Sequence, residues 1–185
     1  MHGSLKGALA GAILLSAAVA IPGAAQVGLT SNAPTVTLNA TKNSTLTVSP
    51  SSATATLASI TDNSTANQFS AVNLTTDWNL TAGTSVNLVG WFTTPAQALA
   101  NGTNFIPSSK VEGRVGATAF APFSGNGVGT VGTLGGSLTL FSQAVGAGTY
   151  QGTRNDQLDV RLNLTGTTTV AGSYSGVLNL QAIVQ

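Results

Sequence analysis

Short runs in which apolar and polar residues alternate cover most of the chain, and each run ends at glycine, proline, Asn-Gly or a threonine-rich stretch. A period of two is typical of β-strands that bury one face, and helical periodicity is nearly absent beyond residue 25. One helical turn is expected at 95–100. We expect strands at 35–40, 44–49, 53–60, 69–80, 85–93, 105–106 with 110–115, 117–121, 128–133, 136–142, 157–164 and 173–184. Many short strands at this spacing predict an all-β fold, an immunoglobulin-like antiparallel β-sandwich.

The segment 70–93 predicts a β-hairpin. A three-residue loop with Gly83 at positive φ places Leu80 opposite Val86. The face expected to lie in the core then holds Val72, Leu74, Trp78, Leu80, Val86, Leu88 and Phe92. The outer face holds Asn73, Asp77, Asn79, Asn87, Val89 and Trp91.

Trp91 is therefore expected on the outside of the sheet. A shift of the register by one residue would bury Trp91 but expose Leu88 and Phe92, which is less favourable. An outward tryptophan is either covered by the loop 95–107 or offered to a partner. The partner would be a neighbouring subunit or a sugar ring that stacks on the indole.

The end of the chain predicts a second hairpin, in which 157–164 alternates without a break and 173–184 returns antiparallel after a turn at Gly166. Asp159 and Arg161 are expected on its solvent face, where an ion pair contributes little. One face of the last strand carries Tyr174, Gly176, Leu178, Leu180, Ala182 and Val184. The other edge of this strand needs a partner. We expect it to be the 35–48 segment, from this chain or from a neighbour.

The N-terminus has the three parts of a secretory signal peptide. Lys6 is followed by an apolar run over 7–20 and by small residues at 22–25, so the mature chain is expected to begin at Gln26. The apolar run is shorter than the roughly 20 residues that a membrane span needs. We therefore expect a signal peptide at 1–25, an N-terminal extension at 26–42 and a sandwich domain at 43–185, secreted and without a membrane span after cleavage.

Composition narrows the classes of function. Charged residues make up only 6% of the chain, and without Lys6 five basic residues balance five acidic ones, because the whole chain has six Lys and Arg against five Asp and Glu. No basic run exists to neutralise phosphates, so nucleic acid is not expected as a partner. The single histidine, His2, lies in the signal peptide and there is no cysteine. We therefore expect no catalytic site, cofactor or metal site.

The C-terminal sequence resembles that of a known family. Ala171-Gly-Ser-Tyr-Ser-Gly-Val-Leu-Asn-Leu180 is similar to the terminal strand of bacterial fimbrial (pilus) subunits and of the spore-coat-U-like secreted proteins related to them. The absence of cysteine makes the chain most similar to subunits of alternate-chaperone, CS1-type fimbriae.

This resemblance implies an incomplete sandwich that is secreted to the periplasm and completed by a donated strand. A periplasmic chaperone donates a strand first, and the N-terminal extension of the next subunit then replaces it. The wall of the assembly groove would be formed by Tyr174, Leu178, Leu180, Ala182 and Val184. The donor would be the strand at 35–40, which places Val36, Leu38 and Ala40 on one face.

Two functions follow as hypotheses. The first is a structural subunit of an extracellular, fimbria-like filament or coat that serves cell adhesion, with copies of itself or related subunits as partners. The second is a monomeric secreted or cell-surface sandwich that binds carbohydrate through Trp91. If residues 35–49 pair within their own chain, the protein is a monomer of the same fold.

Overall fold

The computed structural model describes residues 37–185. The signal peptide expected at 1–25 and the donor residue Val36 lie outside the described residues. A compact unit spans Thr41–Gln185. Within the described part of the chain, no helix is long and apolar enough to cross a membrane.

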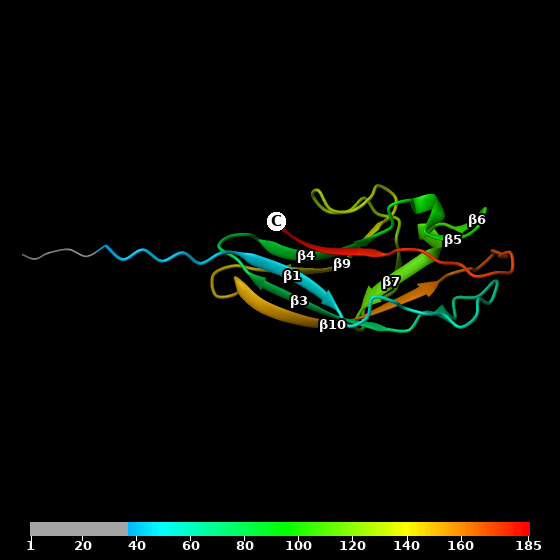
Figure 1. The fold of residues 1–185 in the computed structure, drawn as a ribbon, viewed down its shortest axis with the longest axis horizontal. Helices are drawn as coiled ribbons and strands as arrows, with labels where there is room; N and C mark the ends of the chain where they lie inside the picture. The colour runs from blue at the N-terminus through cyan, green and yellow to red at the C-terminus, as the bar shows by residue number, and fades with distance from the viewer. Residues whose placement is uncertain (1–36) are drawn as a thin grey trace, which may run out of the picture. The chain divides into compact units, whose positions relative to one another are not determined.

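The compact unit is an antiparallel β-sandwich, as expected (Figure 1). One sheet contains, in spatial order, β1 (Thr45–Pro50), β3 (Val72–Asn79), β10 (Gln151–Leu162), β7 (Val111–Val115) and β8 (Ala121–Pro122), with β2 (Asn67–Gln68) also paired to β10. The other sheet contains β11 (Asn179–Val184), β4 (Ser85–Trp91) and β9 (Ser137–Ala144). A small hairpin of β5 (Leu99–Asn101) and β6 (Asn104–Ile106) lies between the 3-10 helices Pro95–Gln97 and Ser108–Lys110.

The order of the strands differs from that of an immunoglobulin domain. If the main strands β1, β3, β4, β7, β9, β10 and β11 are numbered along the chain, the sheets have the orders 1-2-6-4 and 7-3-5. The immunoglobulin orders are 1-2-5-4 and 7-6-3. The fifth and sixth strands have therefore exchanged sheets, so that β10 pairs with β3. In addition, the third strand, β4, lies in the centre of its sheet, between β11 and β9.

The hairpin expected at 70–93 is wrong in its pairing and right in its inner face. β3 and β4 belong to different sheets, so the connection around Gly83 crosses the sandwich and Leu80 does not pair with Val86. The core nevertheless contains Val72, Leu74, Trp78, Val86, Leu88 and Phe92, with Leu80 packed against it. Alternation determines which face of a strand is buried, but it does not specify the neighbouring strand.

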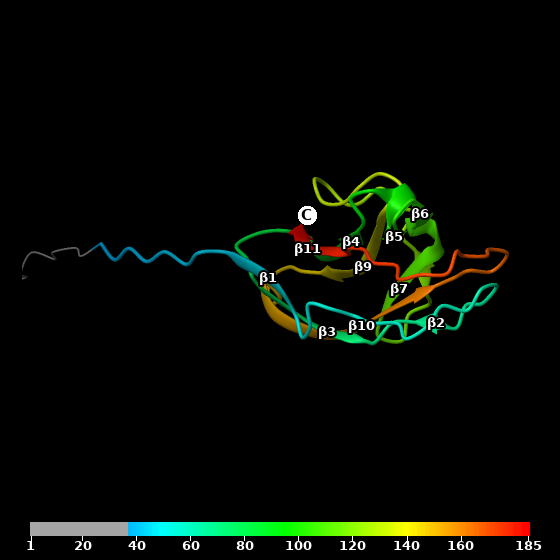
Figure 2. The ribbon, with the colours of Figure 1, turned by 45° about the vertical axis from the view of Figure 1, so that its right-hand side comes forward.

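The C-terminal hairpin is also wrong. β11 pairs with β4, from Asn179 opposite Trp91 to Val184 opposite Val86, and not with β10. After β10 the chain continues through the buried Leu164, turns, and returns at Ser175, whose N–H and C=O both bond to Ala100 of β5. This longer connection carries the chain from one sheet to the other (Figure 2).

Two apolar clusters fill the sandwich, one under β3, β4 and β9 and one near β5, β6 and β7. A β-bulge opposite Leu88 and Val89 places both Leu140 and Phe141 of β9 in the first cluster. Phe123 forms the centre of the second cluster and meets Phe92 edge to face, with ring centroids 5.3 Å apart.

The strand expected at 128–133 is instead part of a glycine-rich loop. Its only pairing is an isolated bridge between Val128 and Val131. The loop lies over the outer face of the β11–β4–β9 sheet, because a Cβ added at Gly129 would lie 2.9 Å from Cδ1 of Ile183. This cover fits the burial of Asn87 and Val89, which were expected on an outer face.

Candidate functional site: an open seam between the two sheets

One side of the sandwich ends in two edge strands. Among residues 37–185, β1 pairs only with β3 and β11 pairs only with β4, and the two edge strands lie side by side across the sandwich (Figures 1 and 2). We call this side of the molecule, along β1 and residues 174–184, the seam. The seam contains no charged residue along β11, no proline in β11 and no bulge there, so it lacks the usual protection of an edge strand.

The backbone of β11 has unused hydrogen-bonding groups on the seam. Ser85 and Gln185 exchange both of their backbone hydrogen bonds, at 3.2 and 3.0 Å. Because paired residues of antiparallel strands alternate between bonded and non-bonded positions, the N–H and C=O groups of Leu180, Ala182 and Val184 point away from β4. Within residues 37–185 these groups have no backbone partner.

Apolar side chains on the seam are incompletely covered. Most of those of the inner strands are buried, and Val86 and Leu88 have 0% exposure. In contrast, the inward side chains of the two edge strands, and of the residue just before β11, pack against the same core but remain half-buried: Leu46, Val48, Leu178, Leu180, Ala182 and Val184. The sandwich is therefore least complete along this one side.

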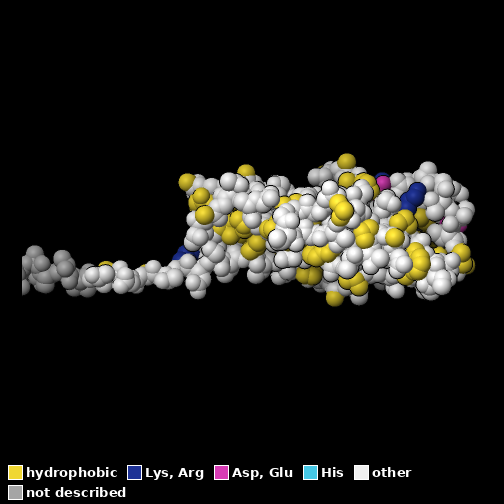
Figure 3. Space-filling model, turned by 90° about the horizontal axis from the view of Figure 1, so that it is seen from above, with side chains coloured by type: hydrophobic (Ala, Val, Ile, Leu, Met, Phe, Trp, Pro, Cys, Tyr) yellow, Lys and Arg dark blue, Asp and Glu magenta, His cyan; other side chains and the backbone are white. Residues whose placement is uncertain are grey.

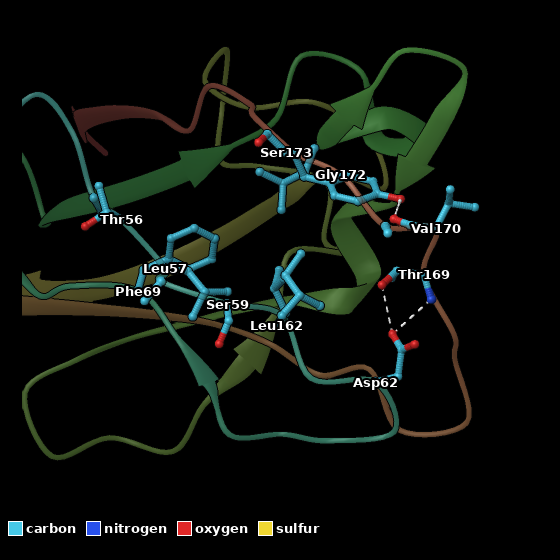
Figure 4. Close-up of a pocket in the computed structure, with 16 residues that line it drawn as sticks. Thr56, Leu57, Ser59, Asp62, Phe69, Leu162, Thr169, Val170, Gly172 and Ser173 are labelled. Atoms are coloured by element: carbon cyan, nitrogen blue, oxygen red, sulfur yellow. Dashed lines mark hydrogen bonds between the residues drawn. The ribbon is translucent and has the colours of Figure 1, made fainter.

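Beyond the end of β1 the seam widens into a cleft with two cavities. The first, about 320 Å³, reaches core side chains of both sheets, among them Val72, Phe92, Leu158 and Leu180. The second, about 580 Å³, lies between residues 55–62 and 169–174 (Figure 4). The cavities meet at three residues that line both of them: Ala55, Phe69 and Leu99.

The far end of the cleft is closed by hydrogen bonds between its two walls. The Asp62 carboxylate accepts hydrogen bonds from the backbone N–H and the hydroxyl of Thr169, at 2.9 and 2.8 Å. Asn63 N–H donates to the carbonyl of Thr167 at 3.2 Å. Figure 4 shows the Asp62–Thr169 contact at the edge of the second cavity.

The groove residues expected from the sequence lie along the seam. Leu178 and Leu180 line the first cavity. Tyr174 lines the second, where its hydroxyl donates to the carbonyl of Val170 at 3.1 Å. Ala182 and Val184 lie beyond the cleft and pack on the first core cluster.

The opposite wall of the cleft was not predicted from the sequence to belong to a site. Residues 52–60 form it, and 53–60 were expected to be an ordinary strand. The structure assigns them no strand, and all are exposed except the half-buried Leu57 and Ile60. A signal was present in the sequence, because Ala53, Ala55 and Leu57 make a weak apolar face of small residues.

The expected donor residues are exposed where the structure describes them. Leu38 is 89% exposed, Ala40 is exposed, and neither belongs to a strand. An exposed leucine in an extended segment is free to be buried against another surface.

Two of the three ion pairs of the described residues lie on the outer face of the sheet that contains β7 and β10. Arg114 pairs with Asp159 at 3.0 Å and Arg161 pairs with Glu112 at 2.6 Å, in both cases from β7 to β10. The ring of Phe120 lies against both guanidinium groups, at 4.3 and 4.1 Å. Asp159 and Arg161 were expected to lie in solvent and to form at most a weak pair with each other. This expectation is wrong, because each pairs with a residue of β7 and Asp159 is only 2% exposed.

Asp62 is the only charged residue that lines the cleft. Figure 3 shows one face of the molecule, on which apolar side chains are scattered over a mostly uncharged surface. Within residues 37–185, no three His, Cys, Asp or Glu side chains come together as metal ligands would.

Trp91 lies at the end of β4, between Asn179 of β11 and Ser137 of β9. Its side chain is half-buried, and its carbonyl accepts a hydrogen bond from the Asn179 amide at 3.3 Å. A role for Trp91 in binding a glycan or a neighbouring subunit stays a prediction.

A comparison of the chain with models of known protein families finds no match. A comparison with curated protein sequences finds no match either.

Proposed function

We propose that the protein is a secreted structural subunit, which assembles with copies of itself or related subunits into an extracellular filament or coat. Assembly takes place by β-strand addition at the seam. One observation carries this proposal: six inward apolar side chains are half-buried along one side of the core. The same side presents a backbone edge without partners.

Strand addition requires two features of the acceptor, and the seam has both. The first is a row of free N–H and C=O groups, which provides affinity for any extended chain. The second is a series of apolar positions that accept every second side chain of the added strand, which provides specificity. Leu180, Ala182 and Val184 supply the free groups, and the cleft beside Leu178 and Leu180 supplies the apolar positions.

The segment 35–40 of a second copy fits this acceptor as the donor. Its six residues span about 20 Å when extended, which matches the six residues of β11, and the uncharged residues that precede the segment would extend into the cleft. Val36, Leu38 and Ala40 alternate with polar residues, and no charge occurs between residues 26 and 41. An uncharged donor with small apolar side chains suits a cleft with a single carboxylate at its closed end.

A periplasmic chaperone is the proposed partner before assembly. An unfilled seam exposes apolar side chains and a strand edge, and both promote aggregation. A chaperone that occupies the seam until the next subunit arrives would prevent this. Secretion through the periplasm is part of the same proposal and rests on the N-terminal sequence.

Deletion of residues 26–42 tests the proposal. The mature protein is expected to form a ladder of oligomers, and the deletion variant is expected to remain monomeric and to be less stable in solution. Light scattering coupled to size-exclusion chromatography measures the difference. Oligomers of unchanged size in the deletion variant would refute strand donation by this segment.

A further inference from the structure

Residues 52–60, which we call the strap, run along the cleft and form its opposite wall. Residues 52–55 line the first cavity and 55–60 line the second. The strap therefore passes the point at which the two cavities meet. Figure 4 shows Leu57 and Phe69 among the side chains that line the second cavity.

The strap is held firmly only at its ends. At one end Ser51 N–H donates to the carbonyl of Asn73 at 2.7 Å, and the Ser51 hydroxyl accepts from Asn73 N–H at 3.0 Å. At the other end Thr61 is bound by the buried Asn67 side chain, with contacts of 2.6 and 2.8 Å. Asp62 adds its bonds to Thr169.

Between these ends, the backbone of the strap bonds to one residue outside it among the described residues, Ser70, while Thr54 bonds to Ser52 within the strap. Ser70 N–H donates to the carbonyl of Thr56 at 2.8 Å, and the Ser70 hydroxyl accepts from Thr56 N–H at 3.0 Å. Its apolar anchors are the half-buried Leu57 and Ile60. A segment with few backbone bonds and little burial opens at low free energy, independently of the rest of the fold.

A strand that follows the whole seam has to pass this point. Tyr174 lines the second cavity and Leu180 lines the first, so contact with both requires an uninterrupted path between the cavities. Leu57 packs against the second core cluster along this path. In an assembled subunit, an apolar side chain of the added strand would pack against the same cluster in place of Leu57.

We infer that the strap is a movable wall, which narrows the cleft in the free subunit and moves away from Ser70 when a strand is added. This inference rests on the proposed function, because the strap restrains assembly at the same seam. It gives the subunit a self-protecting state in which the most apolar part of the cleft is partly covered. The energy needed to lift the strap slows premature assembly.

A reversible cross-link tests the inference, and the lack of native cysteine makes it specific. The full mature chain carries Thr56→Cys and Ser70→Cys, at exposed positions that the backbone hydrogen bond from Ser70 N–H to the Thr56 carbonyl holds together. A matched control carries Thr75→Cys and Asn155→Cys, which lie opposite each other in β3 and β10, away from the cleft. Both proteins are followed by light scattering in oxidised and reduced form.

The oxidised strap variant is expected to remain monomeric and to assemble after reduction. The control is expected to assemble in both forms. Equal assembly of the oxidised and reduced strap variant would overturn the inference. Absence of assembly in every protein, the unmodified chain included, would refute the proposed function instead.

Hydrogen exchange tests the strap even in that case. In the unmodified monomer, the amides of 53–60 are expected to exchange without global unfolding, well before those of β3 and β10. Oxidation of the Thr56–Ser70 cysteine pair is expected to slow this exchange. If the strap amides of the unmodified monomer exchange only together with β3 and β10, the strap is a fixed part of the fold and the inference is wrong.

Discussion

Replacement of Leu38 by alanine separates assembly from folding. Leu38 is 89% exposed in the subunit, so nearly all of its apolar surface is available for burial in a neighbour. The substitution removes about three carbon groups, each worth about 0.8 kcal/mol on burial. The expected loss is therefore about 2.4 kcal/mol per subunit contact, or about 50-fold in the dissociation constant.

The stability of the subunit itself is expected to remain unchanged. Leu38 lies outside the compact unit that begins at Thr41, and removal of an exposed side chain creates no cavity. The thermal unfolding midpoint of the monomer should therefore match that of the unmodified protein. The concentration at which half of the subunits are assembled, measured by analytical ultracentrifugation, should rise.

Asn39→Ala is the matched control for this experiment. Asn39 is the next residue along the same segment and its side chain points to the opposite face of an extended strand. We expect it to change the half-assembly concentration much less than Leu38→Ala. Equal effects of the two substitutions, or no effect of Leu38→Ala, would refute the burial of Leu38 in a neighbouring seam.

Three further substitutions test the fold and the strap. Gly152→Ala places a methyl group against the indole of Trp78, and the overpacking is expected to destabilise the fold by about 1–3 kcal/mol in chemical denaturation. Glu112→Gln removes the charge that pairs with Arg161 at a largely buried position. The free energy of unfolding is expected to fall by about 1–3 kcal/mol. Leu57→Ala loosens the strap and is expected to speed assembly in a light-scattering time course.

Each of these substitutions has a control. Gly146→Ala adds a methyl group where no atom lies within 4 Å, and Asp77→Asn alters a carboxylate on an exposed strand position. Ala58→Ser changes an exposed neighbour of Leu57. If the first two controls destabilise the fold as much as Gly152→Ala and Glu112→Gln, the packing and ion-pair arguments are wrong. Slower assembly of Leu57→Ala would contradict the proposal that the strap restrains assembly.

The sequence predicts the faces of the strands better than their partners. Val72, Leu74 and Trp78 were expected in the core and lie there, because burial of one face imposes alternation on each strand separately. The pairing of β3 with β10 joins residues about 80 positions apart, such as Thr75 and Asn155. No local pattern records such a contact, and both expected hairpins failed for this reason.

The candidate site was predicted in part. One wall, at Leu178 and Leu180, follows from the alternation of the last strand. The other wall was missed because a segment such as 52–60, with an alternating pattern of small residues, looks the same whether it joins a sheet or lies beside one. The burial of Asp159 under Arg114 was missed as well, since cross-strand ion pairs depend on the register of β7 against β10.

Hydrogen exchange at the free edge of β11 tests the central claim most directly. In the monomer, the amides of Leu180, Ala182 and Val184 point toward the seam without a backbone partner, and they should exchange rapidly. If the donated strand fills the seam, these three amides should become protected in assembled material. Exchange at these positions that stays as fast in the assembly as in the monomer would show that no strand is added there.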